Sequence, residues 1–338
     1  MLRFLRLLLL SFAVCFAVIA VSKATVVSYP LPSCYTTSSQ LSVMADTTSV
    51  PVITNTAVYD YSHFSFSGDV VITITAKEEI ASYGISPKAL PIPAVVRGKT
   101  LTFTLQKSSY LIVKINSLRE LIIAADDLES SIPQSVGVRI DNVLRVPYSA
   151  DCTGVKRATA PIQSAIDDAN KAGGGTVYVP AGVYRCGNLV LKSNVSLYLA
   201  GGAVIRGTGN PADYTTHYRK SSLKMDGTWF ISTAENAEHI KVYGRGTIDG
   251  NGSSMRRTHH YLNNLLVPLQ CRDFTVDGII FRDSGLWGLI PTRSNHVTIR
   301  NTKHFNENDL DYEDDAIDIQ ECQDVLVSHT IAVGGGLS

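Results

Sequence analysis

Short stretches of alternating apolar and polar residues fill the chain between about residue 25 and residue 146. Clear examples are residues 63–67, 70–74, 101–105 and 110–115, which are rich in β-branched side chains and are separated by Gly, Ser and Asn. A period of two with turn residues between the runs predicts the strands of an antiparallel sheet. We therefore expect residues 25–146 to form a small antiparallel β-sandwich, an accessory domain without a recognisable cluster of catalytic residue types.

Beyond residue 147 the pattern changes to one helix followed by a repeat. Ile162, Ala165, Ile166 and Ala169 recur at the spacing of one helix face, and three glycines at 173–175 end this predicted helix. A polar residue, an alternating apolar strand and then Gly or Asn recur after it. The first apolar residues of these strands stand at positions 195, 240, 274, 297 and 325.

The last two intervals, 23 and 28 residues, match one coil of a parallel β-solenoid. The interval of 45 is consistent with two coils, and the interval of 34 requires a coil with a long turn. Such coils bury their apolar faces against their neighbours and carry their loops outside. We therefore predict an all-β chain, in which the sandwich is followed by a right-handed, single-stranded parallel β-helix over residues 147–338.

The first residues look like a targeting signal. Arg3 and Arg6 precede an unbroken apolar run at 7–21, and residues 22–24 supply a small-x-small cleavage site. This run is shorter than the roughly 20 residues that span a bilayer. We therefore predict a signal peptide at 1–24 and a secreted, extracellular protein with no membrane segment after cleavage. An uncleaved anchor is the alternative.

Composition narrows the function classes. Of 338 residues, 45% are hydrophobic, and 30 Lys and Arg balance 30 Asp and Glu. Loss of the signal removes Arg3, Arg6 and Lys23, which leaves 27 basic against 30 acidic residues, a net charge of −3. The hydrophobic content rules out a disordered chain. The balance of charge argues against nucleic-acid binding, which needs clustered basic charge. We expect a monomer with a polysaccharide as its partner.

Two further features fit a secreted protein. Asn194 and Asn251 each begin an Asn-x-Ser sequon, so both are predicted glycosylation sites. Cys15 leaves with the signal, and the five remaining cysteines cannot all pair within one chain. One thiol therefore stays free or pairs outside the chain.

Several motifs of the second part resemble one known family. Residues 160–167, 177–184 and 187–193 look like the opening of the polygalacturonase-like glycosidases, glycoside hydrolase family 28. Residues 246–252 resemble that family's G-x-I-D-G-x-G turn, and 284–287 with 295–299 resemble its next coils. The resemblance runs from about residue 146 to the end, and it implies a pectate-lyase-like β-helix that hydrolyses a pectic or related polysaccharide.

Acidic residues are concentrated between positions 305 and 324, where no Lys or Arg occurs. The nine carboxylates there are Glu307, Asp309, Asp311, Glu313, Asp314, Asp315, Asp318, Glu321 and Asp324. Neighbouring carboxylates drive their pKa values apart, which provides an acid and a base from one residue type. An inverting glycosidase needs such a pair, about 6.5–9.5 Å apart. A solvated acidic loop, or a calcium site without a defined loop motif, is the alternative; we predict no metal and no cofactor.

The resemblance offers two registers for this acidic stretch. In the preferred register, residues 314–319 match the family's N-T-D-G-I-D-I motif, with Asp315 in the aspartate position and Asp314 and Asp318 as supporting catalytic candidates. The family's paired Asp-Asp should then follow about one coil later, where residues 334–338 contain no acid. In the other register Asp314 and Asp315 are themselves the pair, but the family's histidine and an earlier acid near Arg293 are missing.

Both registers leave the catalytic set incomplete, because the family's later R-x-K substrate clamp would lie beyond Ser338. A solenoid that stops here would also leave an open coil whose strand edges invite aggregation. The sequence therefore predicts a C-terminally truncated form of a family-28-like hydrolase, whose own activity depends on whether the missing groups are dispensable.

Three other residues are candidates for substrate binding. Trp287 is placed to stack on a sugar ring or to pack within a coil, and Arg256 and Arg257 form the most basic patch, which would grip an acidic sugar or lie in an exposed turn. Two further functions stay open: a dextranase-like hydrolase, because that family resembles the same sandwich-plus-helix architecture, and a non-catalytic carbohydrate-binding remnant. A polysaccharide lyase is less favoured because the acidic stretch lacks a nearby basic residue.

Overall fold

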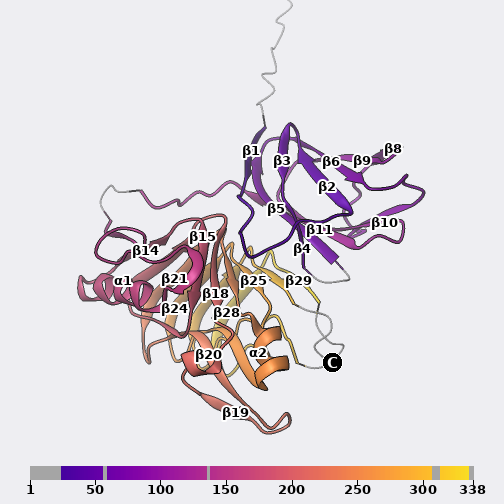
Figure 1. Cartoon of the computed structure of the whole chain (residues 1–338). Coiled ribbons are helices and arrows are strands. Elements are labelled where there is room, and N and C mark those ends of the chain that lie inside the picture. Colours follow the sequence, from indigo (N-terminus) through magenta and orange to yellow (C-terminus); the bar gives the residue numbers. More distant parts are fainter. Residues whose placement is uncertain (1–23, 56–58, 135–137, 307–312, 335–338) are drawn as a thin grey trace, which may run out of the picture.

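A computed structural model describes residues 24–55, 59–134, 138–306 and 313–334. Strands dominate these residues. The helical segments among them are α1 (Thr159–Lys171), the 3-10 helix η1 (Pro211–Asp213) and α2 (Gly252–His259). Figure 1 shows a strand-rich N-terminal part, in indigo and violet, that lies against one side of a larger coiled part running from magenta to yellow.

The N-terminal part is a sandwich of two sheets. One sheet has the order β1 (Thr25–Ser28), β5 (Tyr59–Ser67), β11 (Glu120–Asp127), β10 (Ser109–Ile115) and β7 (Tyr83–Ser86), and β4 (Val52–Thr54) also pairs with β5. The other has the order β3 (Thr48–Val50), β2 (Leu41–Ala45), β6 (Val70–Ala76), β9 (Thr100–Leu105) and β8 (Ala94–Arg97). Their inner faces share one core, in which Ile72, Leu101 and Leu111 are fully buried.

The alternating runs of the sequence are strands in this sandwich. Residues 63–67 lie in β5, 70–74 in β6, 101–105 in β9 and 110–115 in β10. The pairing departs from the expected antiparallel arrangement at one place, because β5 and β11 run parallel from Tyr59 beside Glu120 to Phe66 beside Asp127. The long chain between these two strands returns to the same end of the sheet before β11 begins.

The second part is a parallel β-helix with three sheets. We call the first the repeat sheet: β12 (Ile140–Asn142), β14 (Gly175–Val179), β17 (Val195–Leu199), β21 (Glu238–Gly244), β24 (Arg272–Asp277), β26 (Asn295–Arg300), β28 (Gln323–Ser328). The second is the docking sheet: β13 (Thr153–Arg157), β15 (Gly182–Cys186), β18 (Ala203–Gly207), β22 (Thr247–Asp249), β25 (Ile280–Arg282), β27 (Lys303–Phe305), β29 (Ile331–Val333). The third is the site sheet: β16 (Leu189–Leu191), β20 (Met225–Thr233), β23 (Tyr261–Val267), with β19 (Tyr218–Lys220) on β20.

The five apolar positions picked out by the repeat stack in one column of the repeat sheet. Ile240 pairs with Phe274, Phe274 with Val297, and Val297 with Val325, while the pairing of Ser196 with Lys241 sets Val195 beside Ile240. Every interval is therefore a single coil. The expectation that 45 residues hold two coils is wrong, because η1 and the β19–β20 hairpin lengthen that one coil. Helix α2 lengthens the coil of 34 residues.

Helix α1 forms as its apolar spacing predicts. Ile162, Ala165, Ile166 and Ala169 are all buried against the first coils, and the backbone N–H groups of Gly173 and Gly174 bond to the last-turn carbonyls of Asn170 and Ala169. Both glycines adopt positive φ, which a residue with a side chain rarely does. The helix closes the first end of the β-helix core.

The sandwich docks on the docking sheet through a mixed interface. The sandwich residues Tyr35, Tyr59 and Tyr61 belong to one buried cluster that also contains Val204, Ile280 and Phe305 of the β-helix. Phe305 is fully buried there. The Arg282 guanidinium lies 4.1 Å from the Tyr35 ring centre and donates to the Tyr61 hydroxyl at 3.2 Å. These contacts hold the sandwich against one flank of the β-helix and leave the site sheet on another (Figure 1).

Buried charges complete this interface. Asp126 of the sandwich contacts Lys303, which is fully buried, and lies 2.8 Å from His63 Nε2 and 3.2 Å from Arg245 Nε. Burial lowers the pKa of Lys303 to about 8 and that of His63 to about 4, although Asp126 opposes both shifts. Burial alone would raise the pKa of Asp126, but Lys303, His63 and Arg245 outweigh it and hold this pKa well below its ordinary value.

Two expectations about the ends lie outside what the structure decides. The predicted signal at 1–24 falls almost wholly outside the described residues. No helix among the described residues has the length and apolar character needed to cross a membrane. The predicted boundary at 146 stays a prediction, and the first strand to pair within the β-helix, β12, already begins at Ile140.

Candidate functional site

The site sheet continues beyond β23 into two later coils that form only isolated bridges. Leu266 bridges Leu289, and Leu289 bridges Ile317. The same register, two residues earlier in each coil, aligns Asn264, Trp287 and Asp315, and β20 adds Trp229 opposite Asn264. Trp229, Asn264, Trp287 and Asp315 therefore form one row over four successive coils, which we call the site row.

The three predicted catalytic aspartates lie at the end of this row. Asp315 is exposed, Asp318 is half-buried, and Asp314 is buried. The main-chain oxygen of Asp315 accepts a hydrogen bond from Gly288 N at 2.8 Å, which anchors it beside the coil of Trp287. Asp318 Oδ2 accepts from Gln320 Nε2 at 3.0 Å. The structure thus brings Asp315 and Trp287 onto adjacent coils. Glu307, Asp309 and Asp311 lie outside the described residues.

A hairpin arm formed by β19 and the start of β20 covers the site row. The Lys220 ammonium lies 4.5 Å above the Trp287 ring and pairs with Glu313. The Tyr218 hydroxyl donates to Asn264 Oδ1 at 3.0 Å, and His217 stacks on Trp229 with ring centres 4.7 Å apart. This arm was not among the sequence-based candidates. The unusually long interval of 45 residues was the signal that an excursion existed there.

The two arginines of the predicted basic patch behave differently. Both lie on the helix α2, so the alternative of an exposed turn is wrong for this segment. Arg256 is buried, and its Nη1 donates to Gly285 O at 3.5 Å, two residues before Trp287. Burial raises the pKa of Tyr218, and the nearby charge of Arg256 partly offsets this. Arg256 therefore stands beside the arm and the site row, whereas Arg257 is exposed.

The arrangement around the site row suits an acidic sugar. It combines two half-buried indole rings, which Lys220 and His217 contact, with the guanidinium of the buried Arg256 and an exposed carboxylate from Asp315. Aromatic rings provide apolar surface for a sugar ring, and cations attract a carboxylate. Exposed and buried carboxylates in the same coil supply the residue type that glycoside hydrolysis uses.

A second pair of carboxyl groups, Asp249 and Asp283, lies between the docking sheet and the sandwich. Tyr35 donates to Asp249 Oδ2 at 2.7 Å, and Ser253 donates to Asp283 Oδ1 through both its backbone N–H and its hydroxyl. Burial, and then the charge of Asp249, raises the pKa of Asp283. Both groups are enclosed and fully engaged in holding the fold, so we assign them a structural role.

The two predicted glycosylation sites differ in their surroundings. Asn194 is exposed in the turn before β17. Asn251 accepts from Arg206 Nη2 at 3.1 Å and donates to Gly207 O at 3.4 Å, and its sequon hydroxyl on Ser253 is buried against Asp283. The folded chain therefore presents Asn194 to solvent but holds the Asn251 side chain in internal bonds.

The described residues contain no group of three or more His, Cys, Asp and Glu side chains arranged to hold a metal ion. The calcium alternative used Asp309, Asp311 and Glu313. The first two lie outside the described residues, and Glu313 pairs with Lys220. All five cysteines of the described chain are free thiols.

Comparison of the sequence with models of known protein families shows which family the chain belongs to. A sequence model of the family described as rhamnogalacturonase A/epimerase, pectate lyase-like, matches residues 142–336. The chain belongs to this family. The match covers the β-helix and leaves the sandwich outside it. This confirms the pectate-lyase-like β-helix that the motifs indicated, and it places the chain among the polygalacturonase-like and pectin-lyase-like glycoside hydrolases.

Relatives of two activities share its sequence. An exo-poly-α-D-galacturonosidase of Dickeya chrysanthemi is 37% identical over 114 residues, 31% of this chain and 19% of that protein. The mannuronan C5-epimerase AlgE1 of Azotobacter vinelandii is 29% identical over 221 residues, 54% of this chain and 15% of that protein. The chain thus spans less than a fifth of either relative.

A solved structure shares the fold over most of the chain. The family 28 exopolygalacturonase of Yersinia enterocolitica superposes with a TM-score of 0.53 at 18% identity, covering 86% of this chain and 64% of that one. Because the β-helix alone is only part of this chain, coverage of this extent includes residues of the sandwich.

Proposed function

We propose that this protein is a secreted glycoside hydrolase that cleaves a pectic or related acidic polysaccharide. The observation that carries the proposal is the site row, where Asp315 follows Trp287 by one coil and Lys220 lies over the indole ring. In this proposal Trp287 provides apolar surface for a sugar ring, Lys220 exchanges its pairing with Glu313 for a uronate carboxylate, and the buried Arg256 adds positive charge beneath the row. Asp315, the exposed carboxylate of the row, would take part in cleaving the bond. The polygalacturonate-acting relative supports this substrate class.

The reaction we propose is single-displacement hydrolysis with inversion. One aspartic acid gives its proton to the glycosidic oxygen as the bond to the anomeric carbon breaks. A second carboxylate removes a proton from the water that attacks the opposite face of that carbon. Asp315 is our principal catalytic candidate, and Asp314 and Asp318 are the supporting ones. Arg257, which is exposed on α2, would act at most at the rim of the site.

A second candidate function has its own observation. The mannuronan C5-epimerase relative matches a longer stretch of this chain than the galacturonosidase does, 54% against 31%. An epimerase of this kind would take and return the proton at C5 of a uronate and leave the chain length unchanged. Both candidates share an acidic polysaccharide as substrate, so they differ only in the bond that changes.

One set of product measurements separates the candidates. The chain would be incubated with polygalacturonate, polymannuronate and dextran, followed by reducing-end release, ultraviolet absorbance of unsaturated products and NMR of the uronate configuration. Hydrolysis predicts new reducing ends on polygalacturonate without added absorbance. A changed configuration at constant length would favour the epimerase, release from dextran the dextranase-like alternative, and retention on the polymers without any product the binding remnant.

A further inference from the structure

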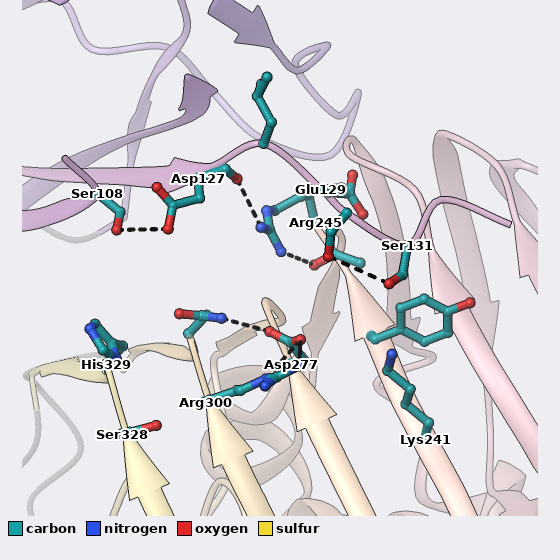
Figure 2. A pocket seen from close by; sticks show the side chains of 15 residues that line it. Ser108, Asp127, Glu129, Ser131, Lys241, Arg245, Asp277, Arg300, Ser328 and His329 are labelled. Carbon is teal, nitrogen blue, oxygen red and sulfur yellow. Dashed lines mark hydrogen bonds and ion pairs between the residues drawn. The ribbon is translucent and has the colours of Figure 1, made fainter. Parts of the chain in front are cut away.

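A cavity of about 420 Å³ lies between the sandwich and the repeat sheet (Figure 2), and its lining includes no residue of β16, β19, β20 or β23. Ser108 and the segment 127–131 form the sandwich wall, and the β-helix wall comes from β21, β24, β26 and β28 with the turns after them. Its size falls within the range of pockets that bind small molecules or short oligomers. We call it the rear pocket.

The β-helix wall of the rear pocket is a single register row. Tyr243 pairs with Asp277, Asp277 with Arg300, and Arg300 with Ser328. Neighbouring strands lie about 4.8 Å apart, so this row extends for roughly 14 Å across four coils. A flat, extended floor of polar groups with one aromatic ring suits an extended ligand with many hydroxyls.

Several polar groups of the rear pocket are already held by hydrogen bonds within its walls. Arg300 and Asn301 both donate to the Asp277 carboxylate, at 2.9–3.0 Å and 2.7 Å. Arg245 Nη2 donates to the main-chain oxygen of Asp127 at 3.1 Å, and Ser108 donates to the Asp127 carboxylate (Figure 2). Preorganised polar groups of this kind lose little freedom when a ligand binds.

Lys241 differs from these groups. Its ammonium lies 4.1 Å from the Tyr243 ring centre, and among the described residues no carboxylate comes within ion-pair distance of it. Burial lowers the pKa of Lys241, with Asp277 acting in the opposite direction. A half-buried cation without a charged partner is unfavourable, and an anionic ligand group would relieve that cost. Among the Lys and Arg side chains that line the described pocket, Arg245 and Arg300 each have a carboxylate partner and Lys241 has none, so an anionic ligand group would supply one.

Hydrogen-bonding groups surround this position on the sandwich side. Ser130 and Ser131 are exposed residues whose hydroxyls lie 3.5 Å apart, and Glu129 accepts from the Tyr198 hydroxyl at 3.1 Å. Burial raises the pKa of Glu129. Serine hydroxyls and carboxyl oxygens are the partners that bind sugar hydroxyls.

We propose that the rear pocket is a second, non-catalytic carbohydrate-binding site, which takes a short segment of an acidic glycan and pairs one of its carboxylates with Lys241. The glycan chain would lie along the row from Tyr243 to Ser328, with its hydroxyls bonded to the sandwich wall. The sandwich then acts as half of a binding site as well as a support. The proposal concerns binding alone, so it stands or falls independently of catalysis at the site row.

The test measures binding of trigalacturonate by isothermal titration calorimetry. The host is the Asp315→Asn protein, so that turnover at the site row does not interfere. Lys241→Gln should weaken the binding at this site about ten-fold or more, because it removes a charge-assisted contact. Lys241→Arg should retain most of the affinity, and Lys156→Gln, at an exposed lysine of β13, should change nothing. Trp287→Ala should affect only the other site.

Two outcomes would overturn the proposal. The first is unchanged trigalacturonate binding in Lys241→Gln when its thermal unfolding matches that of the host. The second is equal competition from maltotriose or from sulfate at matched ionic strength, since a neutral trisaccharide or a bare anion would then suffice. If the unmodified protein releases no sugar but still binds trigalacturonate through Lys241, the proposed hydrolase activity is refuted and the proposed binding site in the rear pocket is supported.

Discussion

At the scale of single residues, the site row depends on side chains that lie far apart in the sequence. Lys220 and Trp287 are brought into contact by the hairpin arm, and Asp315 reaches the same face one coil after Trp287. The acidic cluster and the family-like motifs single out Asp315 and Trp287 in the sequence, but nothing in the sequence around Lys220 indicates that these three side chains lie together. Their function comes from the stacking of coils, which turns a distance of 28 residues between Trp287 and Asp315 into a single step between neighbouring strands.

Lys220 tests whether the arm recognises an acidic substrate. We expect Lys220→Ala to lower kcat/KM on polygalacturonate about ten-fold, mainly through KM, because a charge-assisted contact with a uronate carboxylate is lost. Steady-state kinetics with reducing-end detection checks this. The control is Lys224→Ala, an exposed lysine in the same hairpin. Equal losses for both lysines would show that the arm contributes only its fold.

Asn194 and Asn251 lie in sequons of the same Asn-x-Ser pattern, but we predict opposite glycosylation for them. Expressed in a eukaryotic secretion host, the chain should carry a glycan on Asn194 and little or none on Asn251, because the folded site bonds the Asn251 amide and buries Ser253. Peptide mapping by mass spectrometry gives the occupancy of each. Full occupancy of Asn251 in folded, secreted protein would mean that this turn is assembled differently.

At the scale of elements, the repeat could be predicted from the sequence because its physics is local. One apolar position per coil recurs at each of positions 195, 240, 274, 297 and 325, and the structure stacks all five. The excursions could not be predicted in the same way. The β19 hairpin and α2 lie outside the repeated apolar positions of the coils. Their positions depend on tertiary contacts such as those of Lys220 with Trp287 and of Arg256 with Gly285.

The candidate site was therefore predicted only in part. Asp315 and Trp287 are candidates because each lies in a motif, and Arg256 because it lies in a basic patch. Their proximity, the covering arm and the rear pocket follow from coil register and from the docking of the sandwich. Neither the 45-residue interval nor the composition of residues 127–131 specifies those contacts.

Phe274 tests the stacked column. This side chain is fully buried between Ile240 and Val297, so Phe274→Ala should lower the free energy of unfolding by about 3–5 kcal/mol. Thr275→Ala, its half-buried neighbour on the same strand, should change that free energy by no more than about 0.5 kcal/mol. Urea unfolding followed by circular dichroism compares the two. Similar losses of unfolding free energy in the two variants would mean that the stacked column does not stabilise the core of the β-helix.

At the scale of the whole molecule, the sandwich and the β-helix are held together by buried charges as well as apolar contact. His63 and Asp126 come from the sandwich, and Lys303 and Arg245 come from the β-helix. Because the pKa of His63 is lowered, the unfolded chain binds a proton there that the folded chain does not. Stability from this residue is complete above about pH 6.5 and is lost as the pH falls toward about 4.

The stability of the folded protein should therefore fall in acid, and protonation of His63 on unfolding should account for part of this fall. We expect Tm to fall between about pH 6.5 and pH 4, and His63→Gln, which keeps a donor for Asp126, to make that fall shallower. Asp126, whose pKa is also lowered, adds a further loss at still lower pH. Differential scanning calorimetry across this range gives both slopes. Parallel curves for the two proteins would show that His63 does not titrate on unfolding.

The proposed hydrolase activity depends on catalysis by carboxylates on the site row. Reducing-end release from polygalacturonate, measured for the chain, for Asp315→Asn and for Asp324→Asn, tests it most directly. Asp324 is an exposed aspartate on the repeat sheet, so it serves as a matched control. We predict release by the chain and by Asp324→Asn, and a loss of at least about a hundred-fold in Asp315→Asn. Equal release by all three proteins, or release by none, would contradict the proposed site.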